Sequence, residues 1–301
     1  MQILSILKNI SNEVSKYIQE NYYTAQAKFL KQDNFINVSG DLQKGIDNIV
    51  NDKIIDLVKA AKLPVIIISE ETGIIKLHTN PTHFLLLDPI DGSNNVRPWF
   101  TPHPNLVISM GFGEIGKLKG LGLDAIDVCI VKEIFSDNTY YSIKDQGAYF
   151  QNNFLKYQLR TSKNISLTEA PIIGVDLDKK VEFSADLVSL ITGNIIVRRL
   201  GSTILDLCQV AAGQYDAYIS TGNRLKVTDV CQPYALIKQS GGVIELSAYY
   251  KNELFSNNFL YECLSNQDLL RDIRFKVIAS GSEVLFQDIK GLVVPFHNLG
   301  Y

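Results

Sequence analysis

The feature that most constrains this chain is an apolar run that ends in two aspartates. Phe84–Leu87 is apolar throughout, Asp88 follows directly, and Asp91 comes three residues later with Pro89 between them. A continuous apolar run of this length is typical of a strand buried on both faces. A carboxylate at the end of such a strand has to be paired, hydrogen-bonded or metal-bound, because an isolated buried charge is costly.

The residues that follow allow two interpretations. Pro89 and Gly92 favour a turn that directs both aspartates toward one point. Gly92 and Ser93 would then present backbone N–H groups beside that point, as phosphate-binding turns do. The alternative is a simple exit from the strand in which the aspartates only form the turn, since this composition is typical of turns.

A second pair of acids follows another apolar run. Val65–Ile68 is apolar, and Glu70 and Glu71 come just after it. Sites in open α/β sheets lie at the carboxyl ends of strands, so we expect these acids near Asp88. Clustered carboxylate oxygens suit Mg²⁺ or Mn²⁺ rather than zinc. Adjacent acids at a strand end also occur as solvated loop residues, which is the alternative.

Three further segments carry candidate residues. Asp47 falls beside the apolar face of a predicted helix over residues 42–58, where a carboxylate suggests a catalytic or supporting role. Gly201-Ser202 predicts a helix start whose N–H groups can meet a ligand. Asp229 opens another predicted helix, although the helix dipole alone also favours an acid there.

The order of apolar patterns predicts an α/β protein of two halves that divide near residue 160. The first half, 1–160, begins with helices over 3–18 and 42–58 and continues with strands. The second half, 161–301, alternates strands and helices. Strands are expected at 65–68, 84–87, 105–112, 123–131, within 138–160, and at 172–175, 195–197, 216–220, 243–246 and 275–279. Helices in the second half are expected at 181–191, 202–212, 228–239 and 282–289.

Composition excludes several classes of protein. The 301 residues include 29 Lys and Arg against 32 Asp and Glu, and 46% are hydrophobic, as in ordinary globular proteins. The net charge of −3 and the absence of basic runs give no expectation of a nucleic-acid partner. No apolar run reaches the roughly 18–20 residues of a membrane span, and no basic leader is present, so we expect a cytoplasmic location. The four cysteines and four histidines lack the spacing of zinc sites.

Taken in order, these segments resemble the inositol monophosphatase/fructose-1,6-bisphosphatase superfamily of Mg²⁺-dependent phosphatases. The resemblance covers most of the chain and depends on Glu70-Glu71, the string Asp88–Asn95, and Asp229 followed by Gly241-Gly242. Archaeal-type members that act on both inositol phosphate and fructose 1,6-bisphosphate are the most similar. The resemblance implies an α-β-α-β-α sandwich of alternating helix and sheet layers, with metals between its halves, and a homodimer or homotetramer.

The resemblance also implies roles for individual residues. Two or three Mg²⁺ ions, or Mn²⁺, would be held by five positions: Glu70, Asp88, the carbonyl of Ile90, Asp91 and Asp229. Glu71 would help to order water, and Asp47 with the Ser93 hydroxyl would orient and deprotonate the attacking water. The N–H groups of Gly92 and Ser93 would bind the phosphate.

The chain departs from the family pattern near the last metal ligand. Thr228 stands where the family usually has Trp. Inositol-selective members have a Glu shortly before Asp229, whereas this chain has Arg224 and Lys226 there. We expect these two cations, with Gly201 and Ser202, to contact the substrate through a second phosphate or sugar hydroxyls. Alternatively, the cations are simply solvated residues before a helix.

The expected function is Mg²⁺-dependent hydrolysis of a small sugar or polyol phosphate, inositol 1-phosphate or fructose 1,6-bisphosphate, by direct attack of water. One alternative is a 3′-phosphoadenosine 5′-phosphate nucleotidase, which needs an adenine slot that Trp99 or Tyr234 would supply. Another is a catalytically silent homologue that binds metal or phosphate. Arg97–Pro104 contains three prolines, which predict a stiff loop that either forms a substrate wall or packs Trp99.

Overall fold

The computed structural model describes the chain in segments that include every element named below. These segments are 2–22, 32–36, 42–96, 103–163, 166–176, 185–220, 222, 224–251, 253–255 and 258–292, with the backbone alone for 32–36, 42–44 and 185–187. Residues 97–102, and with them Trp99, lie outside this set, so the loop prediction stays a prediction. Among the described residues, no helix combines the length and apolarity that crossing a bilayer requires.

The first large sheet has eight strands, all from before residue 160. Their spatial order is β10-β9-β8-β7-β6-β5-β3-β4, and β3 and β5 are its one parallel pair. A separate small pair joins β1 (Gln32–Ile36) to β2 (Leu42–Lys44). The bounds of the eight strands are β3 Val65–Ser69, β4 Gly73–Lys76, β5 His83–Asp91, β6 Val107–Glu114, β7 Ile126–Glu133, β8 Thr139–Ile143, β9 Gly147–Gln151 and β10 Lys156–Gln158.

The second sheet has six strands, all from after residue 160. Their order is β12-β11-β13-β16-β14-β15, with β11 parallel to both of its neighbours. Their bounds are β11 Ile172–Asp176, β12 Ile196–Arg198, β13 Ala217–Ser220, β14 Val243–Tyr250, β15 Glu253–Leu254 and β16 Arg274–Ser280.

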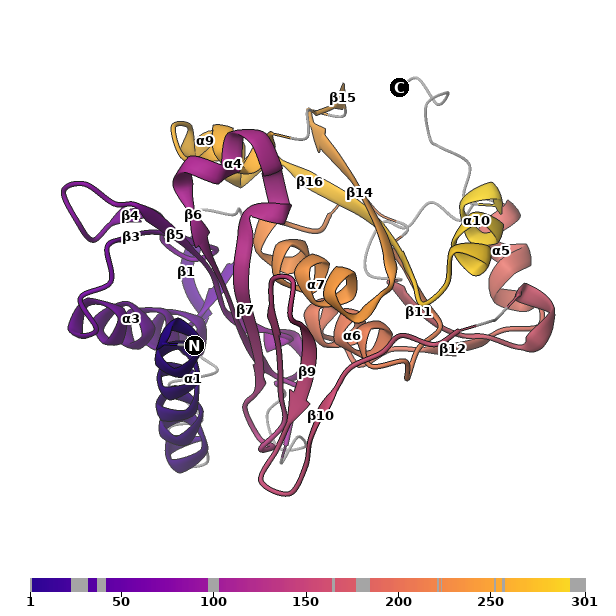
Figure 1. Ribbon diagram of the computed structural model, residues 1–301, viewed down its shortest axis with the longest axis horizontal. Coiled ribbons are helices and arrows are strands. Elements are labelled where there is room, and N and C mark those ends of the chain that lie inside the picture. The colour runs from indigo at the N-terminus through magenta and orange to yellow at the C-terminus, as the bar shows by residue number, and fades with distance from the viewer. Residues whose placement is uncertain are drawn as a thin grey trace.

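Helices cover both faces of each sheet, which confirms the predicted α-β-α-β-α sandwich (Figure 1). Successive residues of β3 alternate between two cores, so this strand is buried on both faces, as its apolar run predicts. Val65 and Ile67 pack with the outer helices, while Ile66 and Ile68 pack in the core shared with the second sheet. The outer helices of the first sheet are α1 Gln2–Asn21 and α3 Gly45–Ala60, the central helices are α6 Thr203–Ala211 and α7 Val227–Ser240, and the outer helices of the second sheet are α5 Ala185–Thr192 and α10 Glu283–Leu292.

The structure differs from the predicted elements chiefly at the end of β5. The strand does not stop at Leu87 but continues to Asp91, with a register shift against β6 between Asp88 and Asp91. Ile90 is buried there, which explains why the backbone stays in the sheet. Several elements were not predicted because they are too short for a periodic pattern. These include β4, β15, α4 (Ile115–Leu121), α8 (Phe259–Cys263) and α9 (Gln267–Asp272).

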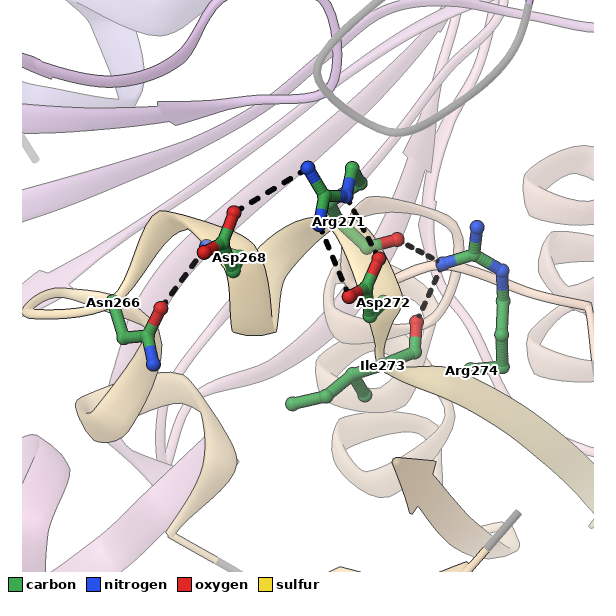
Figure 2. Close-up of polar contacts among 6 residues, drawn as sticks. All are labelled: Asn266, Asp268, Arg271, Asp272, Ile273 and Arg274. Atoms are coloured by element: carbon green, nitrogen blue, oxygen red, sulfur yellow. Dashed lines mark hydrogen bonds and ion pairs between the residues drawn. The ribbon is translucent and has the colours of Figure 1, made fainter. Parts of the chain in front are cut away.

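Short helix α9 shows how local polar contacts define such an element (Figure 2). The side chain of Asn266 accepts a hydrogen bond from the Asp268 backbone N–H at 3.1 Å and caps the helix. Arg271 lies between two acids, 3.4 Å from Asp268 and 2.8 Å from Asp272. Arg274 donates to the Ile273 carbonyl at 2.9 Å where the chain turns into β16.

Candidate active site

The parallel pairing of β3 and β5 brings the two acidic segments together. Ser69 lies opposite Leu87 in the register, and the Glu70 N–H donates to the Leu87 carbonyl at 3.1 Å. The carboxyl ends of the two strands therefore meet at one edge of the sheet, where Glu70 and Asp88 stand side by side. This is the arrangement expected from the two apolar runs.

A third carboxylate comes from the other half of the chain. Asp229 lies in the first turn of α7, and its side chain accepts a hydrogen bond from the Lys226 backbone N–H at 2.8 Å. Oxygens of Glu70, Asp88 and Asp229 all lie within 4.8 Å of one another. We call these three residues the carboxylate triad.

The triad combines one fully buried carboxylate, Asp88, with two that are partly buried. Asp88 is 1% exposed, and neither of its carboxylate oxygens has a hydrogen-bond partner among the described residues. Burial, and then the charge of Glu70, raise the pKa of Asp88 well above its usual range, and the pKa of Asp229 is raised for the same two reasons. An all-oxygen set with an unsatisfied buried carboxylate fits a hard divalent cation such as Mg²⁺ or Mn²⁺.

Asp91 is held at the start of helix α6. One of its oxygens accepts hydrogen bonds from Ser202 Oγ at 2.6 Å and from the Ile204 N–H at 2.7 Å. Burial raises the pKa of Asp91 to about 6 although these hydrogen bonds lower it. Ser202 also caps α6 by accepting from the Leu205 N–H at 3.1 Å. The sequence predicted that N–H groups at this helix start meet a ligand. In the structure the Ile204 N–H donates instead to the carboxylate of Asp91.

Two asparagines join the segments that carry Asp91 and Ser202. The side chain of Asn95 donates to the carbonyls of Asn105 and Leu200, both at 3.0 Å, and Asn105 donates to Leu200 at 3.1 Å. Gly201 has φ of +78°, and a Cβ there would lie 2.3 Å from the Asn95 Oδ1 atom. We call Asn95 and Asn105 the asparagine clamp. No local sequence pattern indicated this role, because the Leu200 carbonyl that both side chains bind is distant along the chain.

A cavity of about 180 Å³ opens beside these groups. Ten of the predicted site residues line it: Glu70, Ile90, Asp91, Gly92, Ser93, Gly201, Ser202, Arg224, Lys226 and Asp229. Asp47 and Glu71 are buried, 6% and 7% exposed, and neither is part of the wall within the described chain. Lys226 does not simply extend into solvent, because its ammonium lies 2.7 Å from a Glu70 oxygen.

The cavity wall also includes charged residues without a predicted role. Arg199 lies 3.9 Å from Asp176, and both face the cavity. Asp206 accepts a hydrogen bond from the Leu200 N–H at 3.0 Å, and burial raises its pKa to about 7. Asp176 ends the buried strand β11 after an apolar run, as Asp88 comes after the run Phe84–Leu87, so the same sequence signal was available for it.

Comparisons with known proteins agree with this architecture. The sequence profile of the inositol monophosphatase family matches residues 2–262. A bifunctional NADP phosphatase/NAD kinase of Methanococcus maripaludis is 26% identical over 81% of this chain, which spans only 43% of that relative's length. A fructose-1,6-bisphosphatase/inositol-1-monophosphatase of Methanothermobacter thermautotrophicus is 25% identical over 69% of this chain and 72% of its own.

Solved structures show the same fold. A crystal structure of an inositol monophosphatase–fructose 1,6-bisphosphatase superimposes with a TM-score of 0.73 over 97% of this chain and 100% of that chain, at 24% identity. The layered sheets, the order of the motifs and the family profile over most of the sequence lead to one assignment. The chain belongs to the inositol monophosphatase family.

Proposed function

We propose that this protein is a Mg²⁺-dependent phosphatase that hydrolyses a small sugar or polyol phosphate. The observation that supports this most is the carboxylate triad beside a cavity whose wall also contains Ser93 and Arg224. Such a site combines groups for divalent cations with groups for an anionic substrate, which is what phosphoryl transfer to water requires. The family to which the chain belongs supports hydrolase chemistry of this type.

In this proposal, Glu70, Asp88, Asp91, Asp229 and the Ile90 carbonyl hold the metal ions. Bound Mg²⁺ supplies positive charge for the phosphate and lowers the pKa of water, so a site built of acids can accept an acidic substrate. Because the Asp91 oxygen that faces α6 is already hydrogen-bonded, its position is fixed before any ligand arrives.

Residues next to the proposed metal ligands activate the attacking water and bind the phosphate. Asp47 and the Ser93 hydroxyl orient the attacking water and take up its proton, and Glu71 helps to order the site. The N–H groups of Gly92 and Ser93 bind the phosphate oxygens. Asp47 is held in the first turn of α3, and this location is suited to a carboxylate.

The substrate side of the cavity favours a ligand with more than one anionic or hydroxyl group. Arg224 and Arg199 both line it, and Gly201 with Ser202 forms the adjoining wall. A guanidinium binds phosphate in a bidentate manner, so a second phosphate is the natural partner for either arginine. This favours a bisphosphate over a simple monophosphate; the name of one relative, fructose-1,6-bisphosphatase/inositol-1-monophosphatase, includes both classes of substrate.

The proposal is tested by phosphate release from inositol 1-phosphate, fructose 1,6-bisphosphate and 3′-phosphoadenosine 5′-phosphate, with Mg²⁺ or EDTA. Mg²⁺-dependent release from a sugar or polyol phosphate is the expected result. NADP belongs in the panel as a second candidate because a relative's name includes NADP phosphatase. No release from any of the four with Mg²⁺ would support a silent homologue instead. Light scattering on the same sample tests the expected homodimer or homotetramer.

A further inference from the structure

Lys226 contacts two members of the carboxylate triad at once. Its ammonium lies 2.7 Å from Glu70 Oε1, and its backbone N–H donates to Asp229 Oδ2 at 2.8 Å. The Lys226 side chain is 7% exposed and that of Glu70 is 15% exposed. This is therefore a desolvated ion pair inside the site, unlike the mostly exposed pairs elsewhere on the described surface.

The charge around this contact explains why a lysine lies there. The triad brings oxygens of three carboxylates within 4.8 Å of one another, so their negative charges repel. The ammonium of Lys226, 2.7 Å from a Glu70 oxygen, offsets part of this repulsion. Arg199, another cation of the cavity, is directed to Asp176. Lys226, in contrast, contacts the triad directly.

We infer that Lys226 is the resident counter-ion of the metal-free triad and that it competes with a divalent cation for Glu70. The inference rests on the proposed function, because it assumes that the triad binds a metal. An ammonium and a divalent cation on one carboxylate repel each other strongly at low dielectric. Binding of the cation therefore displaces the ammonium from Glu70, and the cost of that displacement weakens the affinity of the site for metal.

The same exchange would connect metal binding to substrate binding. An ammonium released from Glu70 lies at the cavity wall, where an anionic substrate can pair with it. Lys226 is accordingly a positioning residue: it holds Glu70 and Asp229 in place before the metal arrives and becomes available to substrate afterwards. Because Lys226 stabilises the site without metal, the bound metal ions are expected to dissociate more readily than from a site without this lysine.

The test is calorimetric titration of Mn²⁺ into the metal-free full chain, with bound Mn²⁺ counted by electron paramagnetic resonance. Lys226→Met is expected to bind the ion roughly tenfold more tightly than wild type, which lies within the range of coupling free energies between two binding events on one protein. Its metal-free form is expected to unfold at a lower temperature than wild type, with a larger gain on adding Mn²⁺. Lys226→Arg retains the charge and is expected to behave as wild type.

Lys132→Met is the matched control, because Lys132 lies in β7, outside the site, is 5% exposed and donates to the Ser136 carbonyl. Its Mn²⁺ affinity is expected to equal that of wild type. If Lys226→Met does not fold, Lys226→Gln removes the charge while keeping a donor for Glu70. Unchanged or weaker Mn²⁺ binding by the folded neutral variant, with normal binding by wild type, overturns the inference alone. Absence of Mn²⁺ and Mg²⁺ binding by wild type would instead overturn the proposed function.

Discussion

Two clusters of carboxylates in this protein lie in opposite environments, and their pKa values shift in opposite directions. In α9, Asp268 and Asp272 lie on the surface with Arg271 between them, and the hydrogen bond from Arg271 lowers the pKa of Asp272 (Figure 2). In the carboxylate triad, burial raises the pKa of Asp88, which has no hydrogen-bond partner within the described structure. Both acids of the surface cluster are paired with Arg271, whereas in the triad Lys226 contacts Glu70 and leaves both Asp88 oxygens without a partner in the described chain.

The largest expected difference between the two clusters appears when one carboxylate is neutralised in each. Asp88→Asn should reduce phosphate release by about a thousandfold or more, because the lost metal contact is worth several kcal/mol in the transition state. Asp268→Asn makes the same chemical change in α9 and should leave turnover unchanged. Turnover on the preferred substrate of the panel, measured for both variants at saturating Mg²⁺, decides this. Activity retained by Asp88→Asn would contradict the metal assignment.

The two clusters also differ in how they are held together. The contacts of α9 are local in sequence, whereas the site depends on the asparagine clamp across Gly201. Gly201→Ala should cost about 3 kcal/mol of unfolding free energy, since the new Cβ meets Asn95 in addition to the strain of a positive φ. Gly241 also has a positive φ, +90°, but a Cβ there would meet no other atom within 4 Å. Gly241→Ala should therefore lower the free energy of unfolding by only about 1 kcal/mol.

Denaturant unfolding of both glycine variants provides the measurement. Gly201→Ala should also lower turnover, since the segment of Ser202 would move away from Asp91, while Gly241→Ala should not. An equal loss of unfolding free energy in the two variants would mean that the contact of Gly201 with the asparagine clamp does not stabilise this segment.

The pH dependence of stability should separate the triad from α9. A carboxyl whose pKa is higher in the folded than in the unfolded state stabilises the fold below its unfolded pKa, and this stability is lost as pH rises through the folded pKa. For Asp91 the window runs from about 4, its unfolded value, to about 6, and for Asp88 and Asp229 it extends higher. The metal-free protein should therefore lose about 5 °C of melting temperature between pH 5 and pH 8.

Thermal melts with EDTA and with Mg²⁺ across this range test the expectation. Mg²⁺ should restore the loss at pH 8, and Asp88→Asn should reduce the slope in EDTA. In α9 the sign is reversed, because the pKa of Asp272 is lowered and its small contribution is lost only in acid. A metal-free melting temperature that does not fall with rising pH would contradict the raised pKa values.

The smallest effect is expected from the surface cluster itself. Arg271→Ala removes the partner of both α9 acids, but exposed ion pairs contribute little to stability. Melting temperature and turnover should both stay close to those of wild type. A clear loss of turnover would show that the two clusters are coupled.

The sequence alone predicted much of this protein, because local patterns carry the necessary information. Apolar runs marked β3 and β5 and predicted that Glu70 lies near Asp88, and the parallel pairing of the two strands in the structure brings these residues together. Helical periodicity marked α1, α3 and α10. The continuation of β5 to Asp91 was missed, since Pro89 and Gly92 have the composition of a turn while the burial of Ile90 keeps the strand in the sheet.

The family resemblance implied that Asp229 joins Glu70 and Asp88, but local sequence patterns did not determine which distant side chains meet, and the tertiary structure supplies the contacts. Asp229 joins Glu70 and Asp88 because α7 packs between the two sheets, and no local pattern records that contact. The same packing places Lys226 on Glu70 and Ser202 on Asp91. The physical reason is that periodicity reports which face of an element is buried, whereas the partner of a buried charge is set by the packing of whole layers.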